Sequence, residues 1–224
     1  MTDAGSDRPR WDGTRLRRTS AIILTGVILL IGGIAVGRAT APTPPLIPST
    51  TSADAGFARD MQTHHTQAVE MSMIIYAKTD DDSLRTLSYD IATSQSQQAG
   101  QMFGWLSTWG LRQASPEPSM TWMTRPALSG SGHDHGADGM THTPGEAMPG
   151  LATDEQITSL EDATGTDADR IFLELMIAHH LGGVEMAEAV LDRTDTRVVR
   201  SLATGVVTAQ QGEITYMRGL LTGL

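Results

Sequence analysis

Residues 57–71, FARDMQTHHTQAVEM, recur as residues 172–186, FLELMIAHHLGGVEM, and the fold can be predicted from this repeat. At a constant offset of 115 residues, residues 57–106 and 172–221 align without a gap and share 16 identities, including the pairs His64-His65 and His179-His180. A unit that cannot bury its own apolar face packs against its copy. We therefore expect two related halves that share one core in a pseudo-twofold arrangement.

Each copy has the pattern of an antiparallel helical hairpin. Apolar residues at helical spacing predict four long helices, at residues 54–78, 82–109, 167–193 and 196–221. Asp54 is the expected cap of the first helix, and a short extra helix is expected from Thr153. Because the turns at 79–80 and 194–195 are short, two hairpins predict an all-α four-helix bundle.

The N-terminus predicts export. A basic tail, residues 1–20, precedes an uncharged apolar run at residues 21–37, so the positive-inside rule places the tail in the cytoplasm and everything after Arg38 outside. We expect a retained transmembrane anchor at 21–37. A signal peptide cleaved near Ala41, which would release a secreted protein, is the alternative. Residues 38–53, rich in Pro, Ser and Thr, predict an extended linker.

The exported part, residues 54–224, is expected to be one duplicated metal-binding domain with a flexible His- and Met-rich insert at 110–152. Residues 39–224 carry ten Lys and Arg against 23 Asp and Glu, a balance that excludes nucleic acid as a partner and suits cations. The chain has no cysteine, which excludes disulfides, thiolate metal sites and thiol catalysis.

A helical projection places the histidines and methionines of each repeat on the apolar stripe, while Glu70 and Glu185 lie on the opposite face. A single inward histidine is usually a hydrogen-bonded core residue, and inward methionines are usually core filler. Four inward histidines in two identical settings favour metal binding, because buried imidazoles need partners for their nitrogens. The predicted ligands are Met61, His64, His65, Met71, Met176, His179, His180 and Met186.

Imidazole and thioether donors, without cysteine and with few inward carboxylates, favour copper, and Cu(I) over Cu(II); zinc is the alternative through the histidines alone. A di-iron centre would need inward Glu residues and a Glu-x-x-His spacing, which neither repeat has. The insert adds secondary metal candidates, His133, His135, Met140 and His142, with an incidental spacer as the competing interpretation.

The blocks DMQTHHTQAVEMS and LMIAHHLGGVEMA, each followed by a Gln-rich helix, resemble the family called domain of unknown function 305 over residues 54–221. Some members of that family are exported copper-binding or copper-tolerance proteins. The resemblance implies a ferritin-like all-helical bundle and a metal-binding role for the eight His and Met residues. Gln98 stands where the second repeat has Glu213, so an acidic residue there serves only one half.

No catalytic motif is present, so we expect no enzyme. The leading hypothesis is a membrane-anchored extracytoplasmic protein that sequesters or relays copper, with the metal ion and the membrane as its partners. The alternatives are a structural or partner-binding helical bundle whose histidines are core residues, and a ferritin-like metal-dependent redox enzyme.

Overall fold

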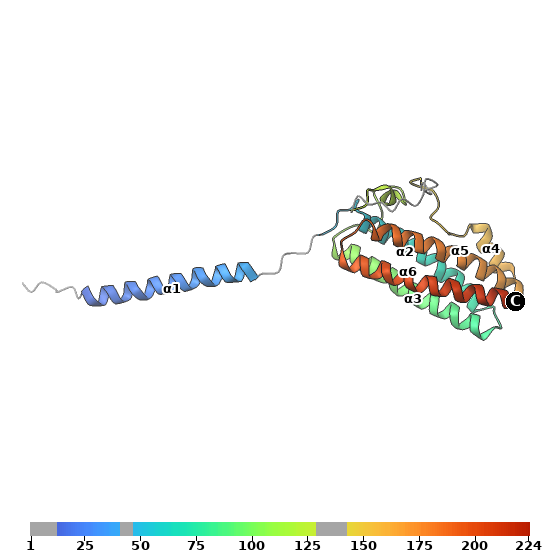
Figure 1. The fold of residues 1–224 in the computed structure, drawn as a ribbon, viewed down its shortest axis with the longest axis horizontal. Helices are drawn as coiled ribbons and strands as arrows, with labels where there is room; N and C mark the ends of the chain where they lie inside the picture. Colours follow the sequence, from blue (N-terminus) through green and yellow to red (C-terminus); the bar gives the residue numbers. More distant parts are fainter. Residues whose placement is uncertain (1–12, 41–46, 129–142) are drawn as a thin grey trace, which may run out of the picture. The chain divides into compact units, whose positions relative to one another are not determined.

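The computed structural model describes residues 13–40, 47–128 and 143–224, with the side chains of the first helix described from residue 23 onward. All regular structure within these residues is helical: α1 (Gly13–Thr40), α2 (Ala53–Tyr76), α3 (Asp82–Thr108), the 3₁₀ helix η1 (Thr121–Thr124), α4 (Asp154–Asp162), α5 (Gly165–Leu191) and α6 (Arg197–Gly223) (Figure 1). Residues 1–46 and 47–224 form two separate units.

Capping side chains define where several helices begin. The Asp81 carboxylate caps α3, and Thr153 with Gln156 forms the reciprocal capping box at α4 that the sequence predicts. Helix α2 differs from the prediction, because Ser52 rather than Asp54 accepts the hydrogen bond from the first turn. Asp54 lies inside that turn and accepts a hydrogen bond from the Thr194 hydroxyl instead.

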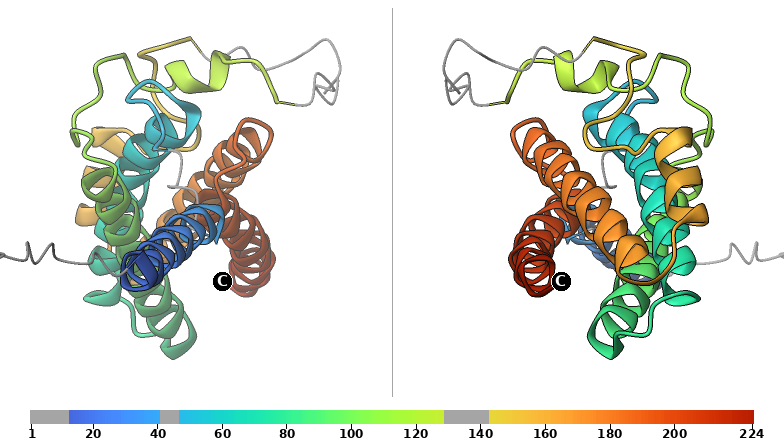
Figure 2. Two further views of the ribbon diagram at one scale, coloured as in Figure 1. Left: turned by 90° about the vertical axis from the view of Figure 1, so that its left-hand side faces the viewer. Right: turned by 90° about the vertical axis from the view of Figure 1, so that its right-hand side faces the viewer.

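Residues 47–224 form a four-helix bundle of two hairpins. Helix α2 packs along α3, α5 packs along α6, and the hairpins meet where α2 contacts α5. Helices α2 and α5 run in opposite directions (Figure 1), and end-on views show the two hairpins crossing obliquely (Figure 2). The fold is therefore all-α, as predicted, and the two repeated His-His motifs lie on the two helices that join its halves.

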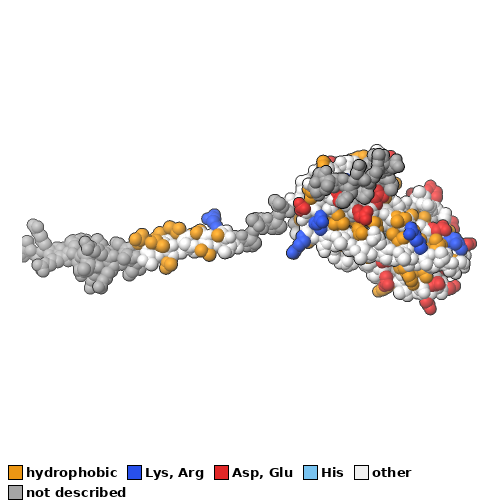
Figure 3. Space-filling model, in the orientation of Figure 1, with side chains coloured by type: hydrophobic (Ala, Val, Ile, Leu, Met, Phe, Trp, Pro, Cys, Tyr) orange, Lys and Arg blue, Asp and Glu red, His pale blue; other side chains and the backbone are white. Residues whose placement is uncertain are grey.

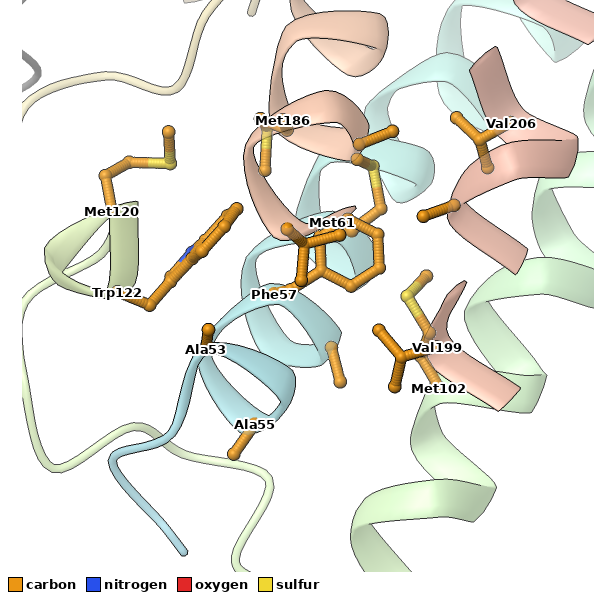
Figure 4. Packing of buried hydrophobic residues seen from close by; sticks show 14 of the residues in the cluster. Ala53, Ala55, Phe57, Met61, Met102, Met120, Trp122, Met186, Val199 and Val206 are labelled. Atoms are coloured by element: carbon orange, nitrogen blue, oxygen red, sulfur yellow. The ribbon is translucent and has the colours of Figure 1, made fainter. Parts of the chain in front are cut away.

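The core consists of two hydrophobic clusters. The first cluster contains Phe57, Met61 and Met186, with Met102 of α3 and Val206 of α6. Figure 4 shows these side chains converging from all four bundle helices. The second cluster contains residues at the equivalent repeat positions, Phe172, Met176, Met71, Met217 and Ile91. Each cluster thus combines side chains from both hairpins.

The described parts of the 110–152 insert pack on the bundle instead of extending freely. Trp122, 2% exposed, meets Phe57 edge to face at 5.8 Å between ring centroids. The Asp60 carboxylate accepts hydrogen bonds from the Trp122 indole (2.9 Å) and from the Met120 backbone N–H (2.7 Å). A side chain on Gly56 would collide with Trp122. The sequence predicted flexibility here because these contacts join residues about 60 positions apart, and local sequence patterns do not reveal them.

Helix α1 contains one segment that meets the length and hydropathy of a membrane span, Ile23–Thr40. Its apolar side chains are exposed, and Figure 3 shows them covering the described part of the helix. By length and composition the segment fits either a membrane anchor or a signal sequence.

Candidate metal centre

Four buried histidines form a layer where α2 crosses α5. His64, His65, His179 and His180 are all 0% exposed. The rings of His64 and His179, one from each repeat, stack across the crossing with their centroids 3.8 Å apart and an interplanar angle of 35°. His65 and His180 flank this pair, each with its ring centroid more than 6 Å from that of its sequence neighbour. The duplication therefore brings the two motifs into contact at one place.

The two central rings are oriented by backbone carbonyls. His64 Nε2 lies 3.0 Å from the Pro149 carbonyl oxygen, and His179 Nε2 lies 2.9 Å from the carbonyl oxygen of His64. A carbonyl oxygen only accepts hydrogen bonds, so both Nε2 atoms carry the proton. The Nδ1 atoms of both rings consequently present bare lone pairs.

The two flanking rings are oriented by side chains of the neighbouring helices α3 and α6. His65 donates from Nε2 to Gln98 Oε1, and His180 donates from Nε2 to Glu213 Oε2, both at 2.7 Å. Gln98 and Glu213 occupy the same repeat position, so the two contacts are equivalent while only the second brings a charge. Partners of this kind fix ring orientation and tautomer in metal sites.

Every imidazole in the layer therefore has a buried Nδ1 atom without a hydrogen-bond partner, namely those of His64, His65, His179 and His180. An unpartnered buried acceptor costs free energy, on the order of 1–3 kcal/mol each. Four such atoms in one layer are the structural feature that a bound metal ion would complete.

Burial keeps three of these rings neutral, those of His64, His65 and His179. Loss of solvation lowers the pKa of His64 to about 4 and that of His65 to about 3, and in His64 the Pro149 hydrogen bond offsets only part of this effect. The pKa of His179 is also lowered well below its usual 6.5, first by burial and then by the neighbouring rings. Neutral imidazole is the form that binds metals, so these three rings need no deprotonation at neutral pH.

Methionine sulfurs flank the histidine layer on both sides, and each side combines the two repeats. Met61 shares the first cluster with Met186, and Met71 shares the second with Met176. Met61 and Met71 are about 15 Å apart along α2, at 1.5 Å per residue, whereas α2 and α5 are antiparallel. Each cluster therefore joins a methionine from one repeat to its neighbour from the other.

Two buried methionines outside the predicted set complete this pattern. Met102 of α3 belongs to the first cluster, and Met217 of α6 to the second. They occupy the same repeat position, so the sequence shows this identity as well. Met120 and Met148 of the insert also lie in the first cluster. Figure 4 shows Met61, Met186 and Met102 around the aromatic ring of Phe57.

Within residues 13–40, 47–128 and 143–224, no three His, Asp or Glu side chains are placed to hold an ion together. The donors that these residues do supply are imidazole nitrogens in the layer and thioether sulfurs on either side. Such a set fits a soft ion of low coordination number better than one that requires several oxygens. The secondary candidates His133, His135, Met140 and His142 lie outside the described residues.

Comparisons with known proteins place the fold. A DUF305 protein from Streptomyces coelicolor is 43% identical, covers 78% of this chain and 95% of its own, and superposes with a TM-score of 0.67. A DUF305 fragment from Deinococcus radiodurans is 28% identical, covers 82% and 100%, and has a TM-score of 0.59. CopM in its Cu(I)-bound form is 23% identical, covers 76% and 96%, and has a TM-score of 0.55, a likeness in fold.

A comparison with curated proteins found no match. The family model described as Domain of unknown function (DUF305) matches residues 54–221, which include both hairpins and the whole histidine layer. This match covers most of the chain, so the protein belongs to the DUF305 family.

Proposed function

We propose that this protein binds copper outside the cytoplasm and sequesters or relays it through the histidine layer and the flanking methionines. One observation carries the proposal: four buried imidazoles each direct Nε2 to a hydrogen-bond acceptor and leave Nδ1 without a partner. A purely apolar core would gain nothing from these four polar atoms. Metal ions that bind to these Nδ1 atoms would remove this free-energy cost.

The donor chemistry supports copper, with Cu(I) favoured. Thioether sulfur and imidazole nitrogen are soft to intermediate ligands, and Cu(I) accepts a small number of them without needing carboxylate oxygens. A monovalent ion also brings the smaller charge into a buried layer. Zinc remains the alternative through the histidines alone.

Structural neighbours agree with this choice by analogy. CopM structures have been determined in forms named Cu(I)-bound, Cu(II)-bound and Ag-bound. At 20–23% identity these neighbours carry the fold alone. The proposal for this chain depends on its own donors.

Helix α1 supports a location outside the cytoplasm for the bundle. Its apolar segment follows five arginines within the first 18 residues, the charge pattern of a helix whose N-terminus stays in the cytoplasm. We propose a membrane anchor with the bundle outside, and the Streptomyces coelicolor neighbour, described as a candidate secreted protein, is compatible with export. The absence of native cysteine permits a direct topology test with single cysteines at Ser6 and at exposed Ser201.

In cells whose cytoplasmic membrane is intact, a membrane-impermeant maleimide should label Ser201→Cys once any envelope layer outside that membrane has been permeabilised. It should leave Ser6→Cys unlabelled until the cells are lysed. Recovery of the Ser201→Cys protein in the membrane fraction is the expected result for a retained anchor. Labelling of Ser6→Cys in unlysed cells would contradict the orientation. Release of the bundle from membranes would indicate cleavage near Ala41.

Metal binding is tested with the full-length protein in detergent, by competition with a colorimetric Cu(I) chelator. The wild type should bind Cu(I), and a variant with the four layer histidines changed to Ala should lose most of that binding. A second variant, Met61→Leu with Met186→Leu, removes two sulfur atoms at nearly constant side-chain volume. It should weaken Cu(I) binding while the circular dichroism spectrum stays unchanged.

The matched control changes His133, His135 and His142, the remaining histidines of the chain, to Ala. It separates the layer from the insert, because only the layer variant should lose high-affinity binding. A wild type that does not compete with the chelator, or layer variants that bind as well as the wild type, would favour the structural bundle with core histidines.

A further inference from the structure

Two buried glutamines share the layer with the histidines. Gln95 of α3 and Gln210 of α6 are 2% and 3% exposed, and neither the oxygen nor the nitrogen of either carboxamide has a hydrogen-bond partner. They occupy the same repeat position, so the arrangement occurs twice. A leucine or methionine would fill such a core position without leaving polar atoms unpaired.

Their neighbours place both carboxamides at the level of the imidazoles. Gln95 lies one helical turn before Gln98, the partner of His65, and Gln210 lies one turn before Glu213, the partner of His180. Along each helix the glutamine separates a residue of one hydrophobic cluster from a methionine of the other. The core is therefore two apolar clusters with a six-residue polar layer between them.

Space for Gln210 is made by a glycine next to the site. A Cβ on Gly183 would lie 2.4 Å from Gln210 Oε1, so only glycine permits this close approach. Gly183 is one turn beyond His179 and His180 on α5, which places the Gln210 carboxamide against the same stretch of helix that carries those rings.

We propose that Gln95 and Gln210 are oxygen donors of the metal layer and that they allow it to hold divalent copper as well as Cu(I). Cu(II) takes nitrogen and oxygen ligands, whereas thioethers favour Cu(I). A carboxamide oxygen beside imidazole nitrogens supplies the harder donor without adding a charged group to the core. This inference rests on the proposed function, and it assigns the two oxidation states to different parts of one site: glutamine and histidine for Cu(II), methionine and histidine for Cu(I).

The test compares Cu(I) and Cu(II) affinities of the full-length protein in detergent, each by chelator competition. Gln95→Leu with Gln210→Leu should weaken Cu(II) binding about tenfold or more, the usual effect of losing a group that supports a metal site. The same variant should leave the Cu(I) affinity within about twofold and should change the electron paramagnetic resonance spectrum of bound Cu(II). Gln95→Glu with Gln210→Glu, which keeps an oxygen donor, should retain Cu(II) binding.

The matched control is Gln97→Leu with Gln211→Leu, which changes exposed glutamines on the same two helices and should alter neither affinity. If Gln95→Leu with Gln210→Leu weakens Cu(I) and Cu(II) binding equally, or does not weaken Cu(II) binding, the assignment of the glutamines as oxygen donors is wrong. The proposed function fails separately, if the wild type binds no copper in either state.

Discussion

Replacing Gly182 by alanine should disrupt the histidine layer from outside it. A Cβ on Gly182 would lie 2.0 Å from the Pro149 carbonyl oxygen and 2.3 Å from its carbon, in a helix where the glycine itself has ordinary geometry. Ordinary contact begins near 3.4 Å, so the segment at Pro149 must retreat by roughly 1.4 Å. That carbonyl is the acceptor that orients His64.

The segment has little freedom to move away. The backbone of Ala152 exchanges two hydrogen bonds of 2.8 Å with the Gln67 side chain, which ties the segment to α2. Gly150, at φ +73°, presses against the backbone of α5, where a Cβ would lie 2.2 Å from the Ala178 carbonyl oxygen. Helix α5 therefore meets a segment that is held on both sides.

The expected loss of unfolding free energy for Gly182→Ala is about 3 kcal/mol. Overpacking costs about 1–3 kcal/mol, an unpaired His64 Nε2–H costs about 1–3 kcal/mol, and the better helix propensity of alanine returns about 1 kcal/mol. The assay is urea unfolding of the metal-free full-length protein in detergent, followed by tryptophan fluorescence. Gly205→Ala in α6 is the matched control, because its Cβ would meet nothing within 4 Å, and it should gain about 0.5–1 kcal/mol. If Gly182→Ala is as stable as the wild type, the account of how this segment orients His64 is wrong.

Three further predictions concern stability in the absence of metal. Burial lowers the pKa of His64 to about 4 in the fold, against about 6.5 when unfolded, so the unfolded state binds more protons, and the free energy of unfolding should fall by about 1.4 kcal/mol per pH unit for this residue as the pH drops from 6.5 to 4; a flat urea midpoint from pH 7 to 5 would contradict this. Trp122→Phe removes the indole donor to Asp60 and should cost about 2 kcal/mol by the same unfolding assay, with an unchanged midpoint as the contrary result. Gly183→Ala meets only the flexible end of Gln210 and should change stability by less than about 1 kcal/mol, unlike Gly182→Ala.

Helix boundaries and inward faces were predictable because they depend on local signals. In each repeat the 3.6-residue period placed the four predicted His and Met ligands on one stripe, and the structure buries all eight of them. The capping box at Thr153 has a sequence signature and forms as expected. At α2, Ser52, which lies two residues before the predicted cap Asp54, makes the bond.

The pairing of donors was not predictable from the repeat alone. The repeat alone does not tell which methionines meet, and the antiparallel crossing of α2 and α5 groups Met61 with Met186. The glutamine partners of the layer lie about 30 residues from the histidines, and nothing local in the sequence marks a residue as buried and unpaired. Pro149 was equally hidden, because its role depends on tertiary contact between the insert and α2.

Nitrogen NMR of the histidine side chains tests directly whether copper binds to the histidine layer. The sample is full-length protein with His133, His135 and His142 changed to Gln, so that only the four layer histidines give signals. Without metal, Nε2 should be protonated in all four rings, as their acceptors require, and Nδ1 should be bare in the neutral rings of His64, His65 and His179. Addition of Cu(I), which is diamagnetic, should shift Nδ1 resonances of the layer while Nε2 stays protonated. Unchanged Nδ1 resonances in the presence of excess Cu(I) would contradict copper binding by this layer.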